Sequence, residues 1–199
     1  MKPESTVNNK KLKTAAGSLP ASGAGLTKED FCRLYGEYKD KLYRYALYRL
    51  GDPGEAEDAV SDCIMAAWQS IGKLRSTEAF GAWIFSILRN CCAAHIREAI
   101  RKRRADEVLA EAASSDNAVT LSGTYSGVSG GIAASHPDSL GIELAEALRL
   151  LTDDEREIVL LSVIGGLSSK EISAETGLTS GSVRSKLSRS LTKMRKFLS

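Results

Sequence analysis

The sequence lacks an apolar run of the length that a membrane helix needs. A helical span takes about 20 mostly apolar residues in a row, and no stretch of the 199 residues approaches that length. Residues 1–25 are basic but contain no apolar segment of the signal-peptide kind, and we interpret them as a disordered extension. The sequence therefore predicts a protein without membrane insertion.

Cysteine is too sparse to form a disulfide framework. The four residues are Cys32, Cys63, Cys91 and Cys92. Three of them fall on apolar helix faces, and the adjacent pair cannot easily bridge, which favours reduced thiols in a cytoplasmic protein. Cys91 and His95, one helical turn apart, would form half of a zinc site. Because no convincing second pair of ligands exists, core packing is the expected role and no metal is predicted.

Residue patterns typical of catalysis are also missing. The two histidines, His95 and His136, are far apart in the sequence. There is no glycine-rich phosphate loop and no obvious pair of carboxylates, which are the usual signatures of nucleotide chemistry and of general acid–base chemistry. The sequence predicts neither an enzyme nor a bound cofactor.

Basic residues are absent from residues 105–138, which carry five acids and are rich in Ala, Ser and Gly. This composition is typical of a flexible, mildly acidic linker. It divides the chain into residues 26–104 and 139–199, and apolar residues recur at helical spacing in both segments. We therefore predict an all-α protein with two small helical domains joined by a flexible linker.

The first domain is expected to contain three helices. Thr27 is the predicted N-cap of the first helix, and Asp52, with Glu55 as its capping-box partner, begins the second. The outer side of the second helix, called the acidic face below, carries Glu55, Glu57, Asp58, Ser61 and Asp62. A charged face is usually just solvated, but this one has a single sign of charge.

The third helix of this domain, ending at Arg104, has two distinct sides. Projection at 100° per residue gives a core side formed by Phe80, Ile84, Ile87, Leu88, Cys91 and His95. The adjoining side, called the Trp83 stripe below, consists of Trp83, Asn90, Arg97, Arg101 and Arg104. A solvated basic face has this composition, and so does a surface that follows a nucleic-acid backbone and stacks on bases.

The second domain has the pattern of a helix-turn-helix. Ser168 and Glu171 form a capping box for a short helix that ends at Gly177, and Thr179 caps a long last helix. The residues expected on its inner side are Val183, Leu187, Ser190, Leu191, Met194 and Leu198.

Bases without acids mark the outer side of this last helix. From Thr179 to the C-terminus there are six Lys or Arg and no Asp or Glu. We interpret the unpaired bases and the neighbouring serines as a surface for DNA phosphates and base edges. The predicted contact residues are Ser180, Ser182, Arg184, Ser185, Lys186 and Arg189. A helical bundle with a solvated basic face is the simpler alternative.

Three segments of the sequence together resemble a known family. They are "GEAEDAVSDCIMAAW", "FGAWIFSILRN" and the stretch from "LLTDDEREIVLL" to "SLTKMRKFL". In this order they are similar to bacterial sigma-70 factors of the extracytoplasmic-function (ECF) branch, over about residues 26–104 and 139–199. Ser61 and Asp62 stand where that family favours Gln and Glu, which is a mild departure.

The resemblance implies a non-enzymatic subunit that directs core RNA polymerase to the −10 and −35 elements of promoter DNA. Residues 26–104 would be region 2 and residues 139–199 region 4. Polymerase would contact Glu57, Asp58, Ser61 and Asp62. The melted −10 strand would contact Lys73, Arg75 and the Trp83 stripe, and the last helix would enter the major groove at the −35 element. An anti-sigma factor is implied as a further partner.

The alternative function is that of a free-standing helix-turn-helix regulator, which binds duplex DNA without polymerase. Such a protein would need a dimerisation surface. It would have no evident use for the acidic face or for the Trp83 stripe.

Overall fold

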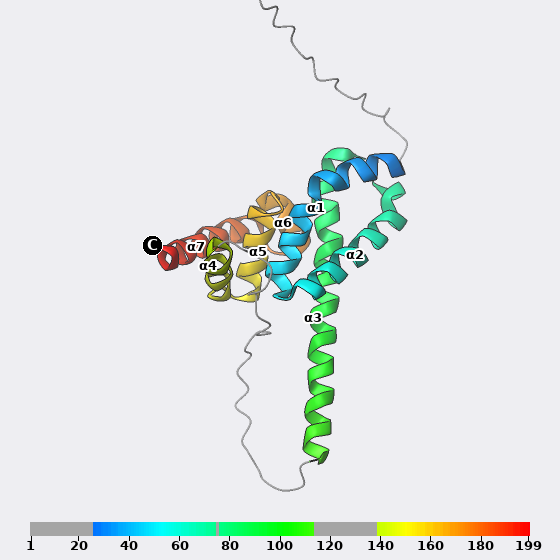
Figure 1. Cartoon of the computed structure of the whole chain (residues 1–199). Coiled ribbons are helices and arrows are strands. Elements are labelled where there is room, and N and C mark those ends of the chain that lie inside the picture. The colour runs from blue at the N-terminus through cyan, green and yellow to red at the C-terminus, as the bar shows by residue number, and fades with distance from the viewer. Residues whose placement is uncertain (1–25, 75, 114–138) are drawn as a thin grey trace, which may run out of the picture.

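The computed structural model describes residues 26–74, 76–113 and 139–199, and within these ranges the regular structure is helical throughout (Figure 1). The main helices are α1 (Lys28–Leu50), α2 (Pro53–Ser70), α3 (Phe80–Ala113), α4 (Ser139–Arg149), α5 (Asp153–Val163), α6 (Ser169–Thr176) and α7 (Ser180–Leu198). Two 3-10 turns, Ile71–Lys73 and Thr77–Ala79, join α2 to α3. The prediction of an all-α protein with two helical domains is confirmed, with α1–α3 in the first domain and α4–α7 in the second.

Side-chain caps fix where most of the helices begin. Reciprocal capping boxes are present at Thr27, Thr152 and Ser168, and the hydroxyl of Thr179 accepts from the backbone N–H of Ser182 at the start of α7. These bonds satisfy backbone donors that have no partner within the helix. The helix starts are therefore set by local sequence.

The predicted capping box at α2 is only half formed. The Asp52 carboxylate accepts from the backbone N–H of Glu55 at 2.9 Å, as expected for an N-cap. The Glu55 carboxylate does not return the bond, because it contacts the ring of His95 on α3 instead. A tertiary contact has thus replaced a local one.

Helix α3 is longer than the sequence predicts. It continues to Ala113, beyond Arg104 and into the segment interpreted as linker. The added residues, "ADEVLAEAA", contain no Gly or Pro and are mostly good helix formers. Figure 1 shows this end of α3 projecting away from the other helices. The rest of the expected linker (114–138) and the expected N-terminal extension (1–25) lie outside the described residues.

By length and composition alone, the stretch Thr77–Val108 would also pass as a membrane span. In the structure four of its large apolar residues, Phe80, Ile84, Phe85 and Leu88, are fully buried, and α3 packs against α1 and α2. This is the arrangement of a core helix in a helical domain.

The buried side of α3 differs from the projected one. Phe85 and Cys92 are buried, whereas Ile87, Cys91 and His95 are only partly covered. The projection assumed that one side of the helix is covered by its own domain. Phe85 packs against Tyr45 of its own domain. It also faces the second domain, which the projection did not include.

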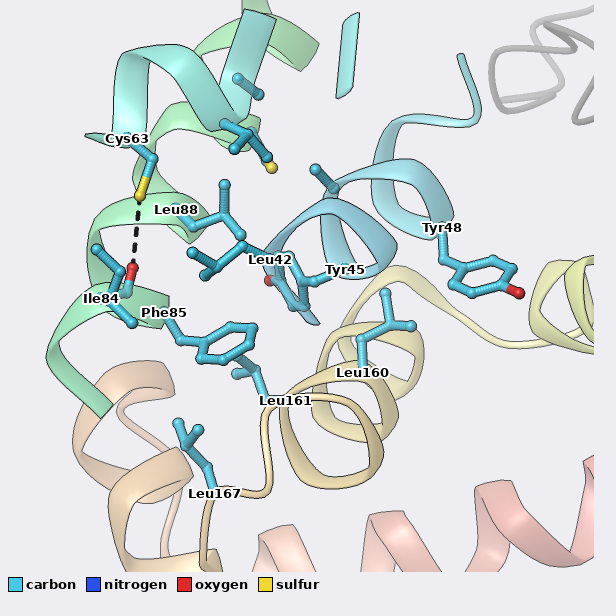
Figure 2. Close-up of a cluster of buried hydrophobic side chains, with 14 of the residues drawn as sticks. Leu42, Tyr45, Tyr48, Cys63, Ile84, Phe85, Leu88, Leu160, Leu161 and Leu167 are labelled. Atoms are coloured by element: carbon cyan, nitrogen blue, oxygen red, sulfur yellow. Dashed lines mark hydrogen bonds between the residues drawn. The ribbon is translucent and has the colours of Figure 1, made fainter. Parts of the chain in front are cut away.

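The two domains pack directly against each other through α1 and α5. Figure 2 shows Leu160, Leu161 and Leu167 of the second domain directed toward Tyr45 and Phe85 of the first. All five side chains are buried, so the two domains share one apolar core here. We call this contact the domain interface.

Ion pairs lie beside the apolar part of the domain interface. Arg49 of α1 lies 3.3 Å from the Asp153 carboxylate, and both Arg49 and Arg89 reach the carboxylate of Glu157. Arg89 also donates to the backbone carbonyl of Glu175 at 2.9 Å. Glu157 is therefore the residue of the second domain on which two arginines of the first domain converge.

One polar atom in this region has no partner among the described residues, namely the buried hydroxyl oxygen of Tyr45. Burial raises the pKa of Tyr45, and the nearby Glu157 raises it further. The hydroxyl is thus neutral and lacks a hydrogen bond, which is an unfavourable arrangement for a buried polar group.

Candidate nucleic-acid interface

Helices α6 and α7 form a helix-turn-helix around a tight turn. Gly177 ends α6 with a φ of 72°, a left-handed conformation that favours glycine. The Ser173 hydroxyl donates to the carbonyl of Leu178 at 2.6 Å and so ties the turn to α6. On the inner side of α7, Val183, Ser190 and Met194 are buried, which leaves the opposite side to solvent.

The outer side of α7 presents most of the predicted DNA contacts to solvent. Ser182, Arg184, Ser185 and Arg189 are exposed, while Ser180 and Lys186 are half-buried. The Ser182 hydroxyl lies 2.9 Å from that of Thr179 and so takes part in the N-cap. Arginines and short polar side chains on the first turns of such a helix are the groups that reach base edges and phosphates.

The expectation that the bases of α7 have no counter-charge is wrong for two of them. Lys186 lies 3.2 Å from Asp154, and Lys193 lies 2.9 Å from Glu155. Both acids are in the first turn of α5, about 30–40 residues earlier in the chain. The sequence window that began at Thr179 could not include them. Arg184 and Arg189 have no ion pair within the described parts of the chain.

Two residues expected on the inner side of α7, Leu191 and Leu198, are partly exposed. The side of α7 that carries Leu191 and Leu198 lines an apolar groove of about 460 Å³, together with residues of α4 and α5 such as Leu144 and Val163. Leu191 and Leu198 are 38% and 48% exposed. Their apolar spacing is helical, but the residues that the structure describes leave the groove unfilled.

The Trp83 stripe is present on α3 as a partly exposed surface. Trp83 is half-buried and its ring packs against Phe80, with 5.7 Å between ring centroids. Asn90, Arg97 and Arg104 are exposed. Arg101 is exposed and forms a pair with Glu98 at 2.6 Å. The stripe therefore combines an anchored aromatic ring with an exposed amide and exposed guanidinium groups, of which that of Arg101 is paired.

The loop before α3 carries one further predicted cation, Lys73. Lys73 is exposed at the end of the first 3-10 turn. The adjacent Leu74 is buried and its carbonyl accepts from the backbone N–H of Leu26 at 3.1 Å, which fixes the loop against the start of α1. Arg75, the other predicted contact, lies outside the described residues.

Arg89 was not among the residues predicted from sequence to have a role. It precedes Asn90 and lies about 100° away around the helix, so it fell between the core side and the stripe. In the structure it is bound by Glu157 and by the Glu175 carbonyl. Its position next to Asn90 was the one available signal that it bears on this surface.

The acidic face of α2 is on the protein surface. Glu57, Asp58, Ser61 and Asp62 are all exposed, and the Ser61 hydroxyl donates to the backbone carbonyl of Glu57 at 2.8 Å. Asp58 forms no ion pair or side-chain hydrogen bond within the ranges that the structure covers. The face is therefore open to a partner with basic groups.

Asp62 is exposed but is not free, because His95 of α3 lies between it and Glu55. The ring Nδ1 of His95 lies 2.6 Å from Glu55, and its Nε2 lies 3.1 Å from Asp62. These hydrogen bonds, that to Glu55 above all, raise the pKa of His95, although partial burial opposes the change. The half zinc site that we considered for Cys91 and His95 is not formed, since both ring nitrogens are engaged by carboxylates.

Two of the four cysteines have the environment of packing residues, whereas Cys32 is exposed and Cys91 is partly buried. Cys63 and Cys92 are buried, and burial raises the pKa of Cys92 to about 12 and also raises that of Cys63. Thiols with raised pKa values are poorly reactive because little thiolate is present. Within the described ranges, no group of three or more His, Cys, Asp or Glu side chains is arranged so that it could hold a metal ion.

Family models match both domains. Sigma-70 region 2 matches residues 34–103, and sigma-70 region 4 matches residues 142–194. The chain is 30% identical over 173 residues to the ECF RNA polymerase sigma factor SigL of Mycobacterium tuberculosis, an alignment that covers 83% of this chain and 88% of SigL. It is 32% identical over 156 residues to the ECF sigma factor BldN of Streptomyces coelicolor, covering 77% of this chain and 54% of BldN.

Solved structures of similar proteins give the same assignment of the fold. The sigma factor RpoE of Bartonella quintana, solved in complex with the anti-sigma factor NepR, superposes with a TM-score of 0.62 at 25% identity, covering 85% of this chain and 97% of RpoE. CnrH, solved in complex with the cytosolic domain of CnrY, superposes with a TM-score of 0.57 at 22% identity, covering 86% of this chain and 89% of CnrH.

Proposed function

The chain belongs to the sigma-70 family, in its ECF branch, and we propose on this basis that it binds core RNA polymerase and directs it to promoters through −10 and −35 elements. The observation that carries the proposal is the presence of both family regions, in order, on one chain, each with a helix that presents cations to solvent. Region 2 supplies α3 with its Trp83 stripe, and region 4 supplies α7.

The division of labour follows from the chemistry of each surface. Helix α7 presents guanidiniums and hydroxyls on a narrow convex surface, which suits the major groove of duplex DNA at the −35 element. The Trp83 stripe offers an aromatic ring beside an amide and cations, which suits an unpaired strand whose bases are unstacked. The acidic face of α2 suits a basic surface of polymerase.

The remaining predictions follow from membership of the sigma-70 family. As a dissociable initiation subunit the protein would not be an enzyme, and it would work in the cytoplasm, where polymerase acts. An anti-sigma factor is an expected partner, since RpoE and CnrH were both solved with proteins that they bind. A free-standing regulator remains the competing function, and the acidic face separates the two.

Binding to both promoter elements requires the domain interface to open. Elements centred near −10 and −35 lie about 25 base pairs apart, or about 85 Å at 3.4 Å per base pair. A helical domain of this size is about 30 Å across, and the two domains are in direct contact. The packed arrangement is therefore incompatible with simultaneous contact, and we propose that it is a closed state.

Charge reversal at Asp58 tests the polymerase contact. We expect Asp58→Lys to weaken association with core polymerase by about 10–100-fold, because it sets like charges against each other across the interface. The exposed Asp58 has no contact to lose within the described residues, so the melting temperature should not change. Affinity is measured by fluorescence anisotropy with purified core enzyme.

Glu143→Lys is the matched control, because Glu143 is an exposed acid on α4, away from the acidic face. It should leave the affinity for polymerase unchanged. Equal, undiminished affinity in the Asp58 variant would favour the free-standing regulator.

Alanine at Asn90 or Arg97 tests the Trp83 stripe. Both side chains are exposed, so their loss should not lower stability, unlike the loss of Trp83, whose ring packs on Phe80. We expect each variant to bind polymerase and closed promoter normally but to open the promoter about 5–100-fold less, because contacts to the unpaired strand are worth about 1–3 kcal/mol. Permanganate footprinting of thymines in the −10 element measures opening.

Two controls accompany this experiment. A template with a pre-melted −10 bubble should largely restore opening, because strand separation is no longer needed. Lys102→Ala removes an exposed cation that lies about 100° from Trp83 around α3 and should have little effect. Normal opening of duplex promoter by both stripe variants would remove the stripe from the mechanism.

A further inference from the structure

His95 connects two acids of α2 from a neighbouring helix. Glu55 and Asp62 are seven residues apart, which is two helical turns, and His95 of α3 lies between them with one ring nitrogen on each. The His95 side chain is 18% exposed, whereas the side chains of Glu55 and Asp62 are 49% and 53% exposed. The ring is thus held behind the acidic face while the two carboxylates reach its surface.

This geometry requires the doubly protonated ring. An ionised carboxylate only accepts hydrogen bonds, and a neutral imidazole has one N–H donor. Two carboxylate contacts, at 2.6 and 3.1 Å, therefore need both ring nitrogens to carry hydrogens. In this state His95 places a positive charge within the acidic face.

We propose that His95 is an internal counter-ion of the acidic face, and that association with core polymerase is coupled to the loss of its proton. The inference rests on the proposed function, since it takes the acidic face as the polymerase contact. Basic groups of polymerase and the imidazolium compete for the carboxylate of Asp62 and repel each other. Polymerase therefore binds the deprotonated form more tightly, and by linkage binding expels the proton.

The groups around the ring set the direction of the effect. Glu55 and Asp62 are the charged groups that act on it from α2. On α3, Cys91 lies one turn earlier with its thiol near Asp62, and Glu98 is paired with Arg101. On α1, Arg49 is engaged with Asp153 and Glu157 in the domain interface. The ring thus titrates against two carboxylates that its own domain provides.

The sign of the pH dependence follows. The pKa of His95 is raised, so its bonds to the carboxylates are fully present below about pH 6.5 and are lost as the pH rises through the raised pKa. Across the same interval the acidic face gains one unit of negative charge. Affinity for polymerase should therefore increase as the pH rises. Over the same interval, the stabilisation of the fold by the charged ring should decrease.

Two substitutions separate charge from structure. His95→Gln keeps a polar side chain and removes the positive charge, whereas His95→Arg keeps the charge at every pH. From about pH 6 to about pH 9, affinity of the unaltered protein for core polymerase should rise about tenfold. The Gln variant should stay near the high-pH affinity throughout, and the Arg variant near the low-pH affinity.

A calorimetric measurement addresses the proton directly. Binding near neutral pH, measured in two buffers of different ionisation enthalpy, should release a fraction of a proton to the buffer in the unaltered protein. The Gln and Arg variants should release less. This readout does not depend on how either variant changes the melting temperature.

The outcomes distinguish this inference from the proposed function. If Asp58→Lys has no effect on affinity, the acidic face is not the polymerase contact and both proposals fail. If Asp58→Lys weakens binding but the pH profile and proton release are the same in all His95 variants, the counter-ion inference alone is wrong. Weaker binding of the Gln variant at every pH would also overturn it, since it would show that the ring only holds the helices together.

Discussion

Replacing Arg184, Lys186 and Arg189 together by alanine is expected to reduce −35-dependent transcription by at least about 100-fold. All three cations lie in the N-terminal half of α7, where a helix in the major groove makes its contacts. A base contact is worth about 1–3 kcal/mol, and a phosphate contact also changes the dependence on salt, with a slope near 0.9 per phosphate. Run-off transcription from a −35-dependent promoter, with binding measured at several salt concentrations, gives both quantities.

The structure orders the single substitutions. Lys186 is partly neutralised by Asp154 at 3.2 Å, so in binding DNA it exchanges one partner for another and should contribute less than Arg184. The double variant of Arg195 and Lys196, two cations at the far end of the same helix, is the matched control and should retain most activity. Unchanged transcription in the triple variant would mean that α7 does not read the −35 element.

Glu157→Arg is expected to open the domain interface. Two arginines, Arg49 and Arg89, converge on the Glu157 carboxylate. The Glu157 side chain is only 14% exposed. The change removes the charge-assisted hydrogen bond from Arg89, worth about 1.5–3 kcal/mol. It also breaks the longer ion pair with Arg49 and puts a third guanidinium among the other two. Closure should weaken by about 3 kcal/mol or more, a factor above about 100 in the ratio of closed to open protein.

Small-angle scattering should report this opening as an increased radius of gyration, with helical content unchanged. Affinity for core polymerase should rise, because a larger fraction of the protein is in the binding-competent form. Adding Arg89→Glu should restore closure in part, since the ion pair is re-formed with reversed charges but the bond to the Glu175 carbonyl is lost. An unchanged radius in the single variant would show that the apolar contacts alone hold the domains together.

The parts of the fold that depend on neighbouring residues were predictable from the sequence. Thr27, Ser168 and Thr179 begin their helices as expected, because a cap involves residues three positions apart. The helix-turn-helix follows from the same local signals. The end of α3 was placed too early, since charge composition suggested a linker where helix propensity sustains a helix to Ala113.

The domain interface could not be predicted, because periodicity shows which side of a helix is apolar and not what covers it. Leu160 and Leu161 occupy apolar positions of α5, which are equally consistent with packing inside the second domain. Glu157 meets Arg89 across 68 residues of sequence, and no local pattern contains that pairing. The counter-charges of Lys186 and Lys193 were missed for the same reason.

The site residues divide in a similar way. Exposure of Asn90, Arg97 and Arg184 followed from helical projection, and the structure agrees. The contacts of His95 did not follow, because the sequence places it on the core side of α3 and predicts packing, whereas its spatial neighbours, Glu55 and Asp62, are carboxylates. The DNA and polymerase contacts of the site residues remain predictions that the experiments above address.

The hydroxyl group of Tyr45 makes the closed protein easier to open than its apolar contacts suggest. Closure leaves this oxygen dry and without a partner among the described residues, at a penalty of about 1–3 kcal/mol for an unsatisfied buried group. When α5 leaves α1, water can hydrate the oxygen again and the penalty is removed. This gain partly offsets the cost of exposing the apolar area of the domain interface to water. The penalty on this single atom thereby lowers the binding energy that a partner must supply to part the two domains.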